Sequence, residues 1–142
     1  MNFELLLDNS AWVRLGSQSL AEARALEIAE TFRSGRLAVC LPFLLEAGYS
    51  ARTAHDHAKI FERLLSLPLI HVDEEVEKSA LDAQSQLARQ GHHRLPPVDL
   101  IIAALASRYR IGVLHYDSDF DLLAERTDLD FKSVWLAPRG EL

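Results

Sequence analysis

The stretch Phe3-Glu4-Leu5-Leu6-Leu7-Asp8-Asn9-Ser10 decides how the rest of the chain is interpreted. Its apolar run predicts a short buried strand over residues 3–7, which stops on the carboxylate of Asp8 and is followed by a helical pattern from Ala11. In an open α/β sheet, ligands and catalytic groups gather at the carboxyl ends of the strands. Other acidic residues that reach the same edge would therefore build a site around Asp8.

Strand and helix patterns alternate along the remaining chain. Strands are predicted over 36–40, 69–72, 111–116 and 131–136, and helices over 18–35, 42–66 with a break near Thr53, 74–90, 98–106 and 122–126. Gly35 and Pro68 end the first two helices, and Asp73 can cap the third. This alternation predicts one domain, residues 1–142, with a three-layer α/β/α fold around a central parallel sheet of four to five strands.

The bulk composition is typical of an ordinary globular protein, with 49% hydrophobic and 25% charged residues among 142. No apolar run approaches the roughly 20 residues of a membrane span, and the N-terminus has no basic, signal-like start, so a cytoplasmic protein is expected. The single Cys40 lies in an apolar segment and is interpreted as a buried spectator thiol. With a net charge of −6, binding of a nucleic acid would require local basic residues or a bound cation.

Three acidic residues stand in unusual surroundings, and each also has an ordinary interpretation. Asp8 ends the first strand and could simply cap the following helix. Glu46 lies among apolar and small residues, where a carboxylate needs a partner; an ion pair with Arg52 or exposure on the outer face is the ordinary alternative. Asp99 begins a helix that is apolar on nearly all sides, and an acid there also complements the helix dipole.

Two more acids, Asp117 and Asp119, follow the fourth predicted strand, and one of them could cap the next helix. Their alternation with Asp121 resembles the opening of a calcium loop, but Leu122 and Asp128 stand where such a loop needs Gly and Glu. Because strand ends share one edge of a parallel sheet, the acids at these positions can converge. Several carboxylates in one place would repel one another unless a cation held them, and such oxygen ligands suit Mg²⁺ or Mn²⁺.

Divalent ions bound by carboxylates suit phosphoryl chemistry, because they neutralise phosphate oxygens, activate a water and stabilise the leaving oxygen. Such an ion would also allow an acidic protein to bind a polyanion. The segment that leads into Asp99 carries four candidates for contacts to flanking phosphates, namely Arg89, His92, His93 and Arg94. An ordinary solvated loop is the alternative. The six histidines show no zinc spacing with cysteine.

Four short motifs carry most of these acids. They are Asp8-Asn9-Ser10 with Trp12, Leu45-Glu46-Ala47, Pro97-Val98-Asp99-Leu100-Ile101-Ile102-Ala103, and Asp117-Ser118-Asp119-Phe120. In their order and spacing they resemble the motifs of PIN-domain ribonucleases, specifically the VapC toxins of type II VapBC toxin–antitoxin systems. The resemblance covers the whole chain. The family commonly has Thr where this chain has Asn9, which is also small and polar.

What this resemblance implies is specific about residues and partners. The catalytic acids would be Asp8, Glu46, Asp99 and Asp117, and the ligands of Mg²⁺ or Mn²⁺ would be Asp8, Asp99, Asp117 and Asp119, with Ser10 as an accessory polar group. Whether Asp117 or Asp119 lies nearer the ion stays open. The resemblance implies that a metal-activated water attacks a phosphodiester of structured RNA, such as tRNA or ribosomal RNA. It also implies a homodimer and a cognate VapB-like antitoxin that neutralises the toxin.

A non-catalytic α/β protein-interaction module, in which the acids only cap helices, is the alternative to an enzyme. Two other enzyme classes fit less well. A phosphoacceptor receiver domain needs an acidic pair directly after the first strand, which is absent here. A haloacid-dehalogenase-like phosphatase needs Asp-x-Asp at that place, where this chain has Ser10 at the third position.

Overall fold

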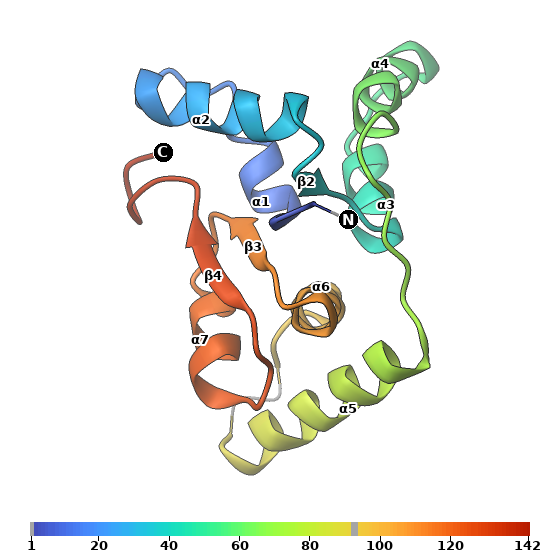
Figure 1. The fold of residues 1–142 in the computed structure, drawn as a ribbon, viewed down its shortest axis with the longest axis vertical. Coiled ribbons are helices and arrows are strands. Elements are labelled where there is room, and N and C mark those ends of the chain that lie inside the picture. The colour runs from blue at the N-terminus through green and yellow to red at the C-terminus, as the bar shows by residue number, and fades with distance from the viewer. Residues whose placement is uncertain (1, 92–93) are drawn as a thin grey trace.

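The structure, a computed structural model, describes residues 2–91 and 94–142. Four strands and seven helices occur in this part of the chain (Figure 1). In order they are β1 (Leu5–Leu7), α1 (Asn9–Trp12), α2 (Glu22–Arg33), β2 (Leu37–Ala38), α3 (Leu41–Tyr49), α4 (Ala54–Leu64), α5 (Glu74–Arg89), α6 (Pro97–Tyr109), β3 (Gly112–His115), α7 (Asp119–Arg126) and β4 (Lys132–Trp135). None of the helices in these residues is both long and apolar enough to span a bilayer.

All four strands are parallel and lie in the order β2-β1-β3-β4. At the centre, Leu5 of β1 is in register with Leu37 of β2 and with Gly112 of β3. The carboxyl ends of the strands therefore share one edge, so the residues that follow β1 and β3 start from neighbouring positions. α1 and α2 lie on one side of the sheet and α6 on the other (Figure 1). The predicted three-layer α/β/α fold is confirmed.

The strands are shorter than the sequence predicts. β1 covers only the last three residues of the predicted 3–7, and β2 covers two of the predicted 36–40. The strand predicted over 69–72 is wrong, because only Leu69 pairs, in an isolated bridge with Val39. α3 begins at Leu41, so the chain next to β2 offers residues 70–72 nothing further to pair with. The sheet consequently has four strands.

Helix ends follow local signals in the sequence. The hydroxyl of Thr53 accepts the N–H of Asp56 at 3.0 Å, so α4 starts separately from α3, where the sequence predicts a break. The carboxylate of Asp73 accepts the N–H of Val76 at 2.9 Å, which confirms it as the cap of α5. Gly35 follows α2 with a φ of 73°, a left-handed conformation that glycine adopts at little cost.

Several helices differ in length from their prediction. α2 begins at Glu22 instead of residue 18, and α6 continues to Tyr109 instead of residue 106. α7 begins at Asp119, three residues before the predicted start, because the carboxylate of Asp117 accepts the N–H of Asp119 at 3.0 Å and closes the preceding turn.

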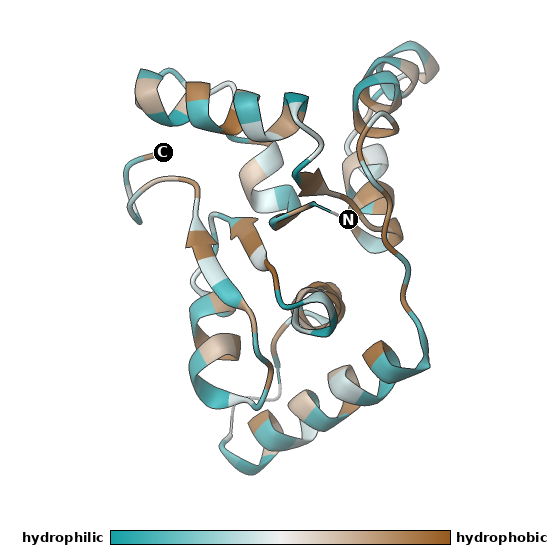
Figure 2. Cartoon of the chain, viewed as in Figure 1, coloured by the Kyte–Doolittle hydropathy of each residue, from teal (hydrophilic) through white to brown (hydrophobic). Residues whose placement is uncertain are grey.

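α6 is the central helix of the molecule, in contact with α3, α5, α7, β1 and β3. Its apolar character on nearly all sides follows from this position, as the sequence predicts. Leu100, Ile102 and Leu105 are almost inaccessible to solvent, and burial of each such side chain contributes about 1.5–3 kcal/mol. This packing on several sides holds the first turn of α6 in place at the edge of the sheet. In Figure 2, by comparison, strand β2 is hydrophobic, whereas α5 carries a mixture of hydrophilic and hydrophobic residues.

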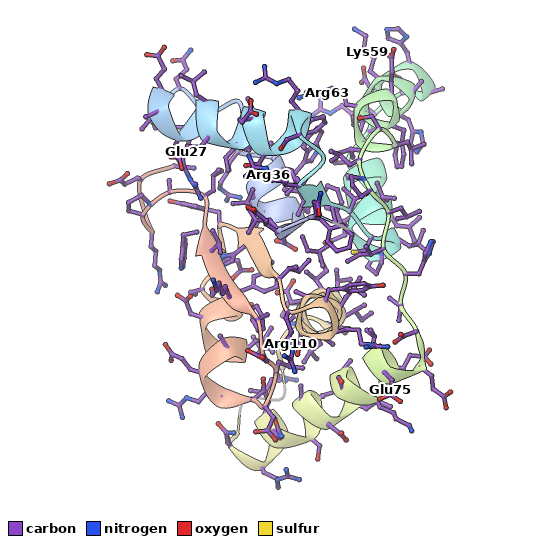
Figure 3. All side chains as sticks on the ribbon, viewed as in Figure 1. Glu27, Arg36, Lys59, Arg63, Glu75 and Arg110 are labelled. Carbon is purple, nitrogen blue, oxygen red and sulfur yellow. The ribbon has the colours of Figure 1, made fainter. Side chains whose placement is uncertain are left out.

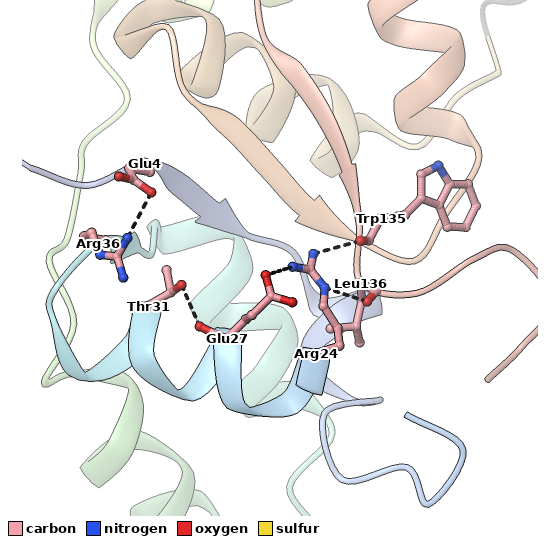
Figure 4. Close-up of polar contacts among 7 residues, drawn as sticks. All are labelled: Glu4, Arg24, Glu27, Thr31, Arg36, Trp135 and Leu136. Carbon is pink, nitrogen blue, oxygen red and sulfur yellow. Dashed lines mark hydrogen bonds and ion pairs between the residues drawn. The ribbon is translucent and has the colours of Figure 1, made fainter. Parts of the chain in front are cut away.

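Charged side chains such as Lys59 and Glu75 project from the periphery of the molecule (Figure 3). One of them fastens two elements together: Arg24 on α2 donates to the backbone carbonyls of Leu136 and Trp135, both at 3.0 Å (Figure 4). Glu27 lies 3.6 Å from the guanidinium of Arg24. α2 is thus tied to the carboxyl end of β4.

Gly112 gives a test of the packing between β1, β3 and β4. A Cβ at this position would lie 2.8 Å from Leu5 Cδ2, 2.9 Å from Val134 Cγ2 and 3.3 Å from a backbone oxygen of β4. We therefore expect Gly112→Ala to lower the free energy of unfolding by about 1–3 kcal/mol in urea denaturation. Gly16→Ala is the control, because nothing lies within 4 Å of its Cβ position. Equal stability of the two variants would contradict the close packing.

Candidate metal centre

Asp8 follows β1 and is buried, with 4% of its surface exposed. Its Oδ2 accepts the N–H of Ser10 at 3.0 Å and the hydroxyl of Ser10 at 2.5 Å, so Asp8 does cap α1. It also faces other acids. Burial raises the pKa of Asp8 more than the hydrogen bonds from Ser10 lower it, and the charge of Asp117 raises it further. The cap and the acidic site therefore share one carboxylate.

Ser10 joins the ends of the two central strands. While its hydroxyl donates to Asp8, the same oxygen accepts the N–H of Tyr116, the residue after β3, at 2.8 Å. Arg14 donates to the carbonyl of Ser10 at 2.8 Å and places its guanidinium 4.9 Å from the centre of the Tyr116 ring. Arg14 is a cation beside Ser10 that none of the sequence motifs includes. Its spacing of four from Ser10, which brings side chains together on a helical turn, was the available signal.

Three carboxylates form the tightest cluster. One oxygen from each of Asp99, Asp117 and Asp119 lies within 4.8 Å of the other two. Asp99 is only 7% exposed, and its Oδ2 is buried without a hydrogen-bond partner in the described part of the chain. A buried acceptor left without a partner costs on the order of 1–3 kcal/mol, more if it is charged. The cluster is therefore incomplete without a proton or a cation.

Burial and neighbouring like charges together favour a proton on Asp99. Burial is the larger cause, and with the charges of the other acids, in the order Asp8, Asp117, Asp119 and Glu46, it raises the pKa of Asp99 to about 8. Burial, and then Asp117, also raises the pKa of Asp119. The other four predicted acids thus all lie within electrostatic range of Asp99, and two of them, Asp117 and Asp119, form the cluster with it.

Glu46 lies at the border of this group. It is half-buried on α3, and burial raises its pKa, with a smaller contribution from the charge of Asp8. Among the ion pairs of residues 2–91 and 94–142, none contains Glu46, so the ordinary alternative of a pair with Arg52 does not hold. Its carboxylate lies within electrostatic range of Asp99 and outside the three-acid cluster.

The donor set fits a hard divalent cation. It consists of carboxylate oxygens only, and among the described residues Oδ2 of Asp99 is buried without a hydrogen-bond partner. The pKa values of Asp8, Asp99 and Asp119 are raised, and a bound positive charge would lower them. Mg²⁺ and Mn²⁺ prefer such oxygen ligands, whereas zinc prefers nitrogen and sulfur. Cys40 is not a competitor, because burial raises the pKa of its thiol to about 12.

No hydrogen bond or ion pair of the described residues links the predicted substrate-binding segment to the acids. Arg89 ends α5, hydrogen-bonds to the hydroxyl of Ser85 at 3.1 Å and lines a hollow with residues 125–128 at the far end of α7. The acids lie at the other end of that helix, so these contacts do not bring Arg89 to them. Arg94 is exposed in the loop before α6. His92 and His93 lie outside the described residues, and their role stays a prediction.

His115, the last residue of β3, is a polar side chain beside the cluster that the sequence analysis missed. It is completely buried, and burial lowers its pKa to about 4. Its Nδ1 accepts the N–H of Asp117 at 3.1 Å, and its Nε2 lies 2.7 Å from the hydroxyl of Ser133. A histidine in an apolar strand gives no local signal of such contacts, since its partners come from other elements.

The profile of the PIN domain matches residues 5–126, which is most of the chain. The chain belongs to the PIN-domain family.

This PIN domain has close relatives over nearly its whole length. Ribonuclease VapC51 of Mycobacterium tuberculosis is 34% identical over 143 residues, covering 100% of this chain and 99% of the relative. Ribonuclease VapC2 of the same species is 35% identical over 126 residues, which is 86% of each chain. VapC ribonuclease Mb1587 of Mycobacterium bovis is 31% identical over 134 residues, covering 91% and 98%. The resemblance to VapC proteins inferred from the sequence is confirmed.

Solved structures agree on the PIN fold. A member of the VapBC family, VapBC-5 of Mycobacterium tuberculosis, gives a TM-score of 0.62 at 25% identity and covers 91% of this chain and 97% of its own. DNA-bound VapBC of Salmonella typhimurium gives a TM-score of 0.75 at 17% identity and covers 95% and 99%. The second likeness is one of fold alone.

The raised pKa of Asp99 makes the stability of the metal-free protein depend on pH. The folded chain keeps the Asp99 proton up to about pH 8, whereas an unfolded chain releases it near 3.8. Between these values the unfolded state binds fewer protons, so the free energy of unfolding falls as pH rises, by up to about 1.4 kcal/mol per pH unit. Asp99→Asn should remove that loss and stabilise the protein at neutral pH.

Urea denaturation in EDTA, at about pH 6 and about pH 8, measures this effect. Asp82→Asn is the matched control, since Asp82 is an exposed acid on α5. If Asp99→Asn instead lowers stability sharply at both pH values, Asp99 acts as a structural group and the repulsion is unimportant.

Proposed function

We propose that this PIN-domain protein is a Mg²⁺- or Mn²⁺-dependent endoribonuclease of the VapC type. One observation carries the proposal: the buried, unpartnered oxygen of Asp99 belongs to a cluster whose ligand atoms, with Asp117 and Asp119, lie within 4.8 Å of one another. The relatives named VapC ribonucleases, at 31–35% identity over most of the chain, support RNA as the substrate. A phosphodiester is also the substrate that a cation in such a cluster serves best.

The residues have distinct roles in this proposal. Asp99, Asp117 and Asp119 would hold the ion, and Asp8 would complete the acidic surround. When bound, the ion supplies charge neutralisation, activation of a water and stabilisation of the leaving oxygen. Ser10 orients Asp8 by donating to its Oδ2.

Proton transfer is assigned to Glu46. Its carboxylate lies outside the three-acid cluster, so it is free to accept a proton, and its raised pKa makes it a stronger base than an exposed glutamate. Arg14 is the cation closest to Ser10 in the contacts of the described residues, and we assign it to a phosphate of the RNA. Arg89, Arg94, His92 and His93 stay secondary candidates for that role.

Structured RNA such as tRNA or ribosomal RNA is the substrate class that we infer, which would place the activity in the cytoplasm. The VapBC assemblies among the solved relatives support a VapB-like antitoxin as partner, and VapBC-5 is the one at 25% identity. A homodimer is part of the same proposal. Leu41, Leu45 and Tyr49 leave an apolar stripe on α3 that is 60–92% exposed, as a surface covered by a protein partner would be.

RNA cleavage should require the acidic side chains themselves, so variants that lose one acid but keep the fold should be inactive. We expect Asp8→Asn and Asp99→Asn to lower the rate of RNA cleavage by about 100-fold or more, because each removes a negative oxygen from the ion's surroundings. The assay follows the cutting of tRNA and ribosomal RNA in Mg²⁺ or Mn²⁺, with circular dichroism to check the fold. Asp82→Asn should cleave like the parent. Parent-like cleavage by both site variants would exclude this centre.

Binding of the ion should also stabilise the folded chain by mass action. At a Mn²⁺ concentration of 100 times the dissociation constant, the free energy of unfolding should rise by about 2.7 kcal/mol. Thermal denaturation with and without Mn²⁺ measures the shift, which should be absent in Asp99→Asn. A non-catalytic interaction module whose acids only cap helices would show no shift in either protein, and that result would favour the alternative function.

A further inference from the structure

The turn that presents Asp117 and Asp119 is held by hydrogen bonds that its backbone N–H groups donate. The N–H of Tyr116 donates to the hydroxyl of Ser10 at 2.8 Å, and the N–H of Asp117 donates to Nδ1 of His115 at 3.1 Å. The N–H of Asp119 donates to the carboxylate of Asp117 at 3.0 Å. His115 is the one of these acceptors that neither the sequence motifs nor the proposed cluster includes.

The hydrogen bonds around His115 have a fixed direction. A backbone N–H can only donate, so Nδ1 of His115 carries no proton and Nε2 carries it in the neutral ring. Nε2 therefore donates to the hydroxyl of Ser133 at 2.7 Å, and Ser133 in turn donates to Oδ1 of Asp121 at 2.6 Å. The imidazole thus accepts one hydrogen bond, from the N–H of Asp117, and donates another. The donated bond leads through Ser133 to the carboxylate of Asp121, which can only accept.

The end of this chain is itself anchored. Trp135 donates from its indole nitrogen to both carboxylate oxygens of Asp121, at 3.2 and 3.0 Å. The Trp135 ring lies 5.0 Å from the ring of His115, and Phe120 lies 4.9 Å from it on another side. Arg24 holds the backbone carbonyl of Trp135 (Figure 4). The imidazole is consequently fixed both by its two nitrogens and by packing.

We propose that His115 is a positioning residue for the metal centre, which holds the backbone of Asp117 through its unprotonated Nδ1 while Ser133, Asp121 and Trp135 fix the orientation of the ring. This inference rests on the proposed metal-dependent function. In the hydrogen bonds of the described residues, the N–H of Asp117 donates to this imidazole alone, so the ring sets where the Asp117 backbone begins the turn. Asp121, the third acid of the Asp117-Ser118-Asp119-Phe120-Asp121 stretch, thereby gains a role. Through Ser133 and His115 it helps to fix the position of Asp117.

A role in packing alone would not require this residue. The neighbouring strand residues Val113 and Leu114 are equally buried and purely apolar, and Leu in place of His115 would need no partners. The imidazole instead requires a donor on one nitrogen and an acceptor on the other, and both are supplied. Groups that orient metal ligands in this way typically change metal affinity by about 10- to 100-fold when they are removed.

Two amide variants separate positioning from packing. His115→Asn keeps an acceptor near the place of Nδ1 but cannot reach Ser133, whereas His115→Gln places its amide near Nε2 and leaves the N–H of Asp117 without an acceptor. Both lose the ring and its packing, so both should lower the melting temperature. His115→Gln should weaken Mn²⁺ binding by about 10- to 100-fold. His115→Asn, which keeps the acceptor for Asp117 but loses the support of Ser133, should weaken it clearly less.

Titration of the metal-free proteins with Mn²⁺, followed by electron paramagnetic resonance of the free ion, measures these affinities without RNA. Parallel losses in both amide variants, or no loss in either, would overturn the positioning role. If His115 variants do not fold, Ser133→Ala carries the test: weaker Mn²⁺ binding is expected, and unchanged binding would overturn the proposal. ¹⁵N NMR of the histidine ring gives a second measurement, in which a proton on Nδ1 instead of Nε2 would also overturn it.

The same titration distinguishes this inference from the proposed function. Asp117→Asn should lose Mn²⁺ affinity if the acidic cluster is a metal centre at all. A parent protein that binds no Mn²⁺ would overturn the metal centre and the positioning role together. A parent that binds Mn²⁺, with His115→Gln equal to it, would overturn only the role of His115.

Discussion

Repulsion among buried carboxylates is the constraint that organises this molecule. Asp8 and Asp99 are almost inaccessible to water, and Asp117 and Asp119 are half-buried. Burial and then the charges of the neighbouring acids raise the pKa of Asp99 to about 8. No ion pair in residues 2–91 and 94–142 relieves this group. The folded chain therefore keeps a charge distribution that costs stability in water, which is typical of sites shaped for a ligand of opposite charge.

The fold can support this cost because of where α6 lies. Its apolar residues form the centre of the core, so the helix is held firmly while its first turn, with Asp99, is placed against the other acids. The N-terminus of a helix favours a negative charge by about 0.3–1 kcal/mol, which offsets only part of the repulsion. The rest is balanced by burial of residues such as Ile102 and Leu105, at about 1.5–3 kcal/mol each.

That these acids meet at one edge of the sheet can be predicted from the sequence, because their positions follow from short-range patterns. Strand and helix periodicity place Asp8 and Asp117 after strands and Asp99 at a helix start, and parallel topology alone then brings these positions to one edge. The network of His115 depends on register between strands instead. His115 pairs with Trp135, so Ser133 and Trp135, two residues apart on one face of β4, both reach Asp121. Nothing local to any of these residues fixes that alignment.

The strand wrongly predicted over 69–72 and the missed His115 have the same physical origin. In both cases the outcome depends on what a neighbouring element offers. The pairing of residues 69–72 stops after the N–H of Ile70, which donates to Val39, because α3 begins at Leu41. His115 finds its partner Ser133 because β4 is in register. The turn after β3 needs such partners more than an ordinary turn does, since its carboxylates repel Asp8 and Asp99 and would tend to open it. The N–H groups of two consecutive residues, Tyr116 and Asp117, donate to Ser10 in α1 and to His115 at the end of β3, and these hydrogen bonds oppose that opening. The polar network thus stabilises the turn against the repulsion between the carboxylates beside it.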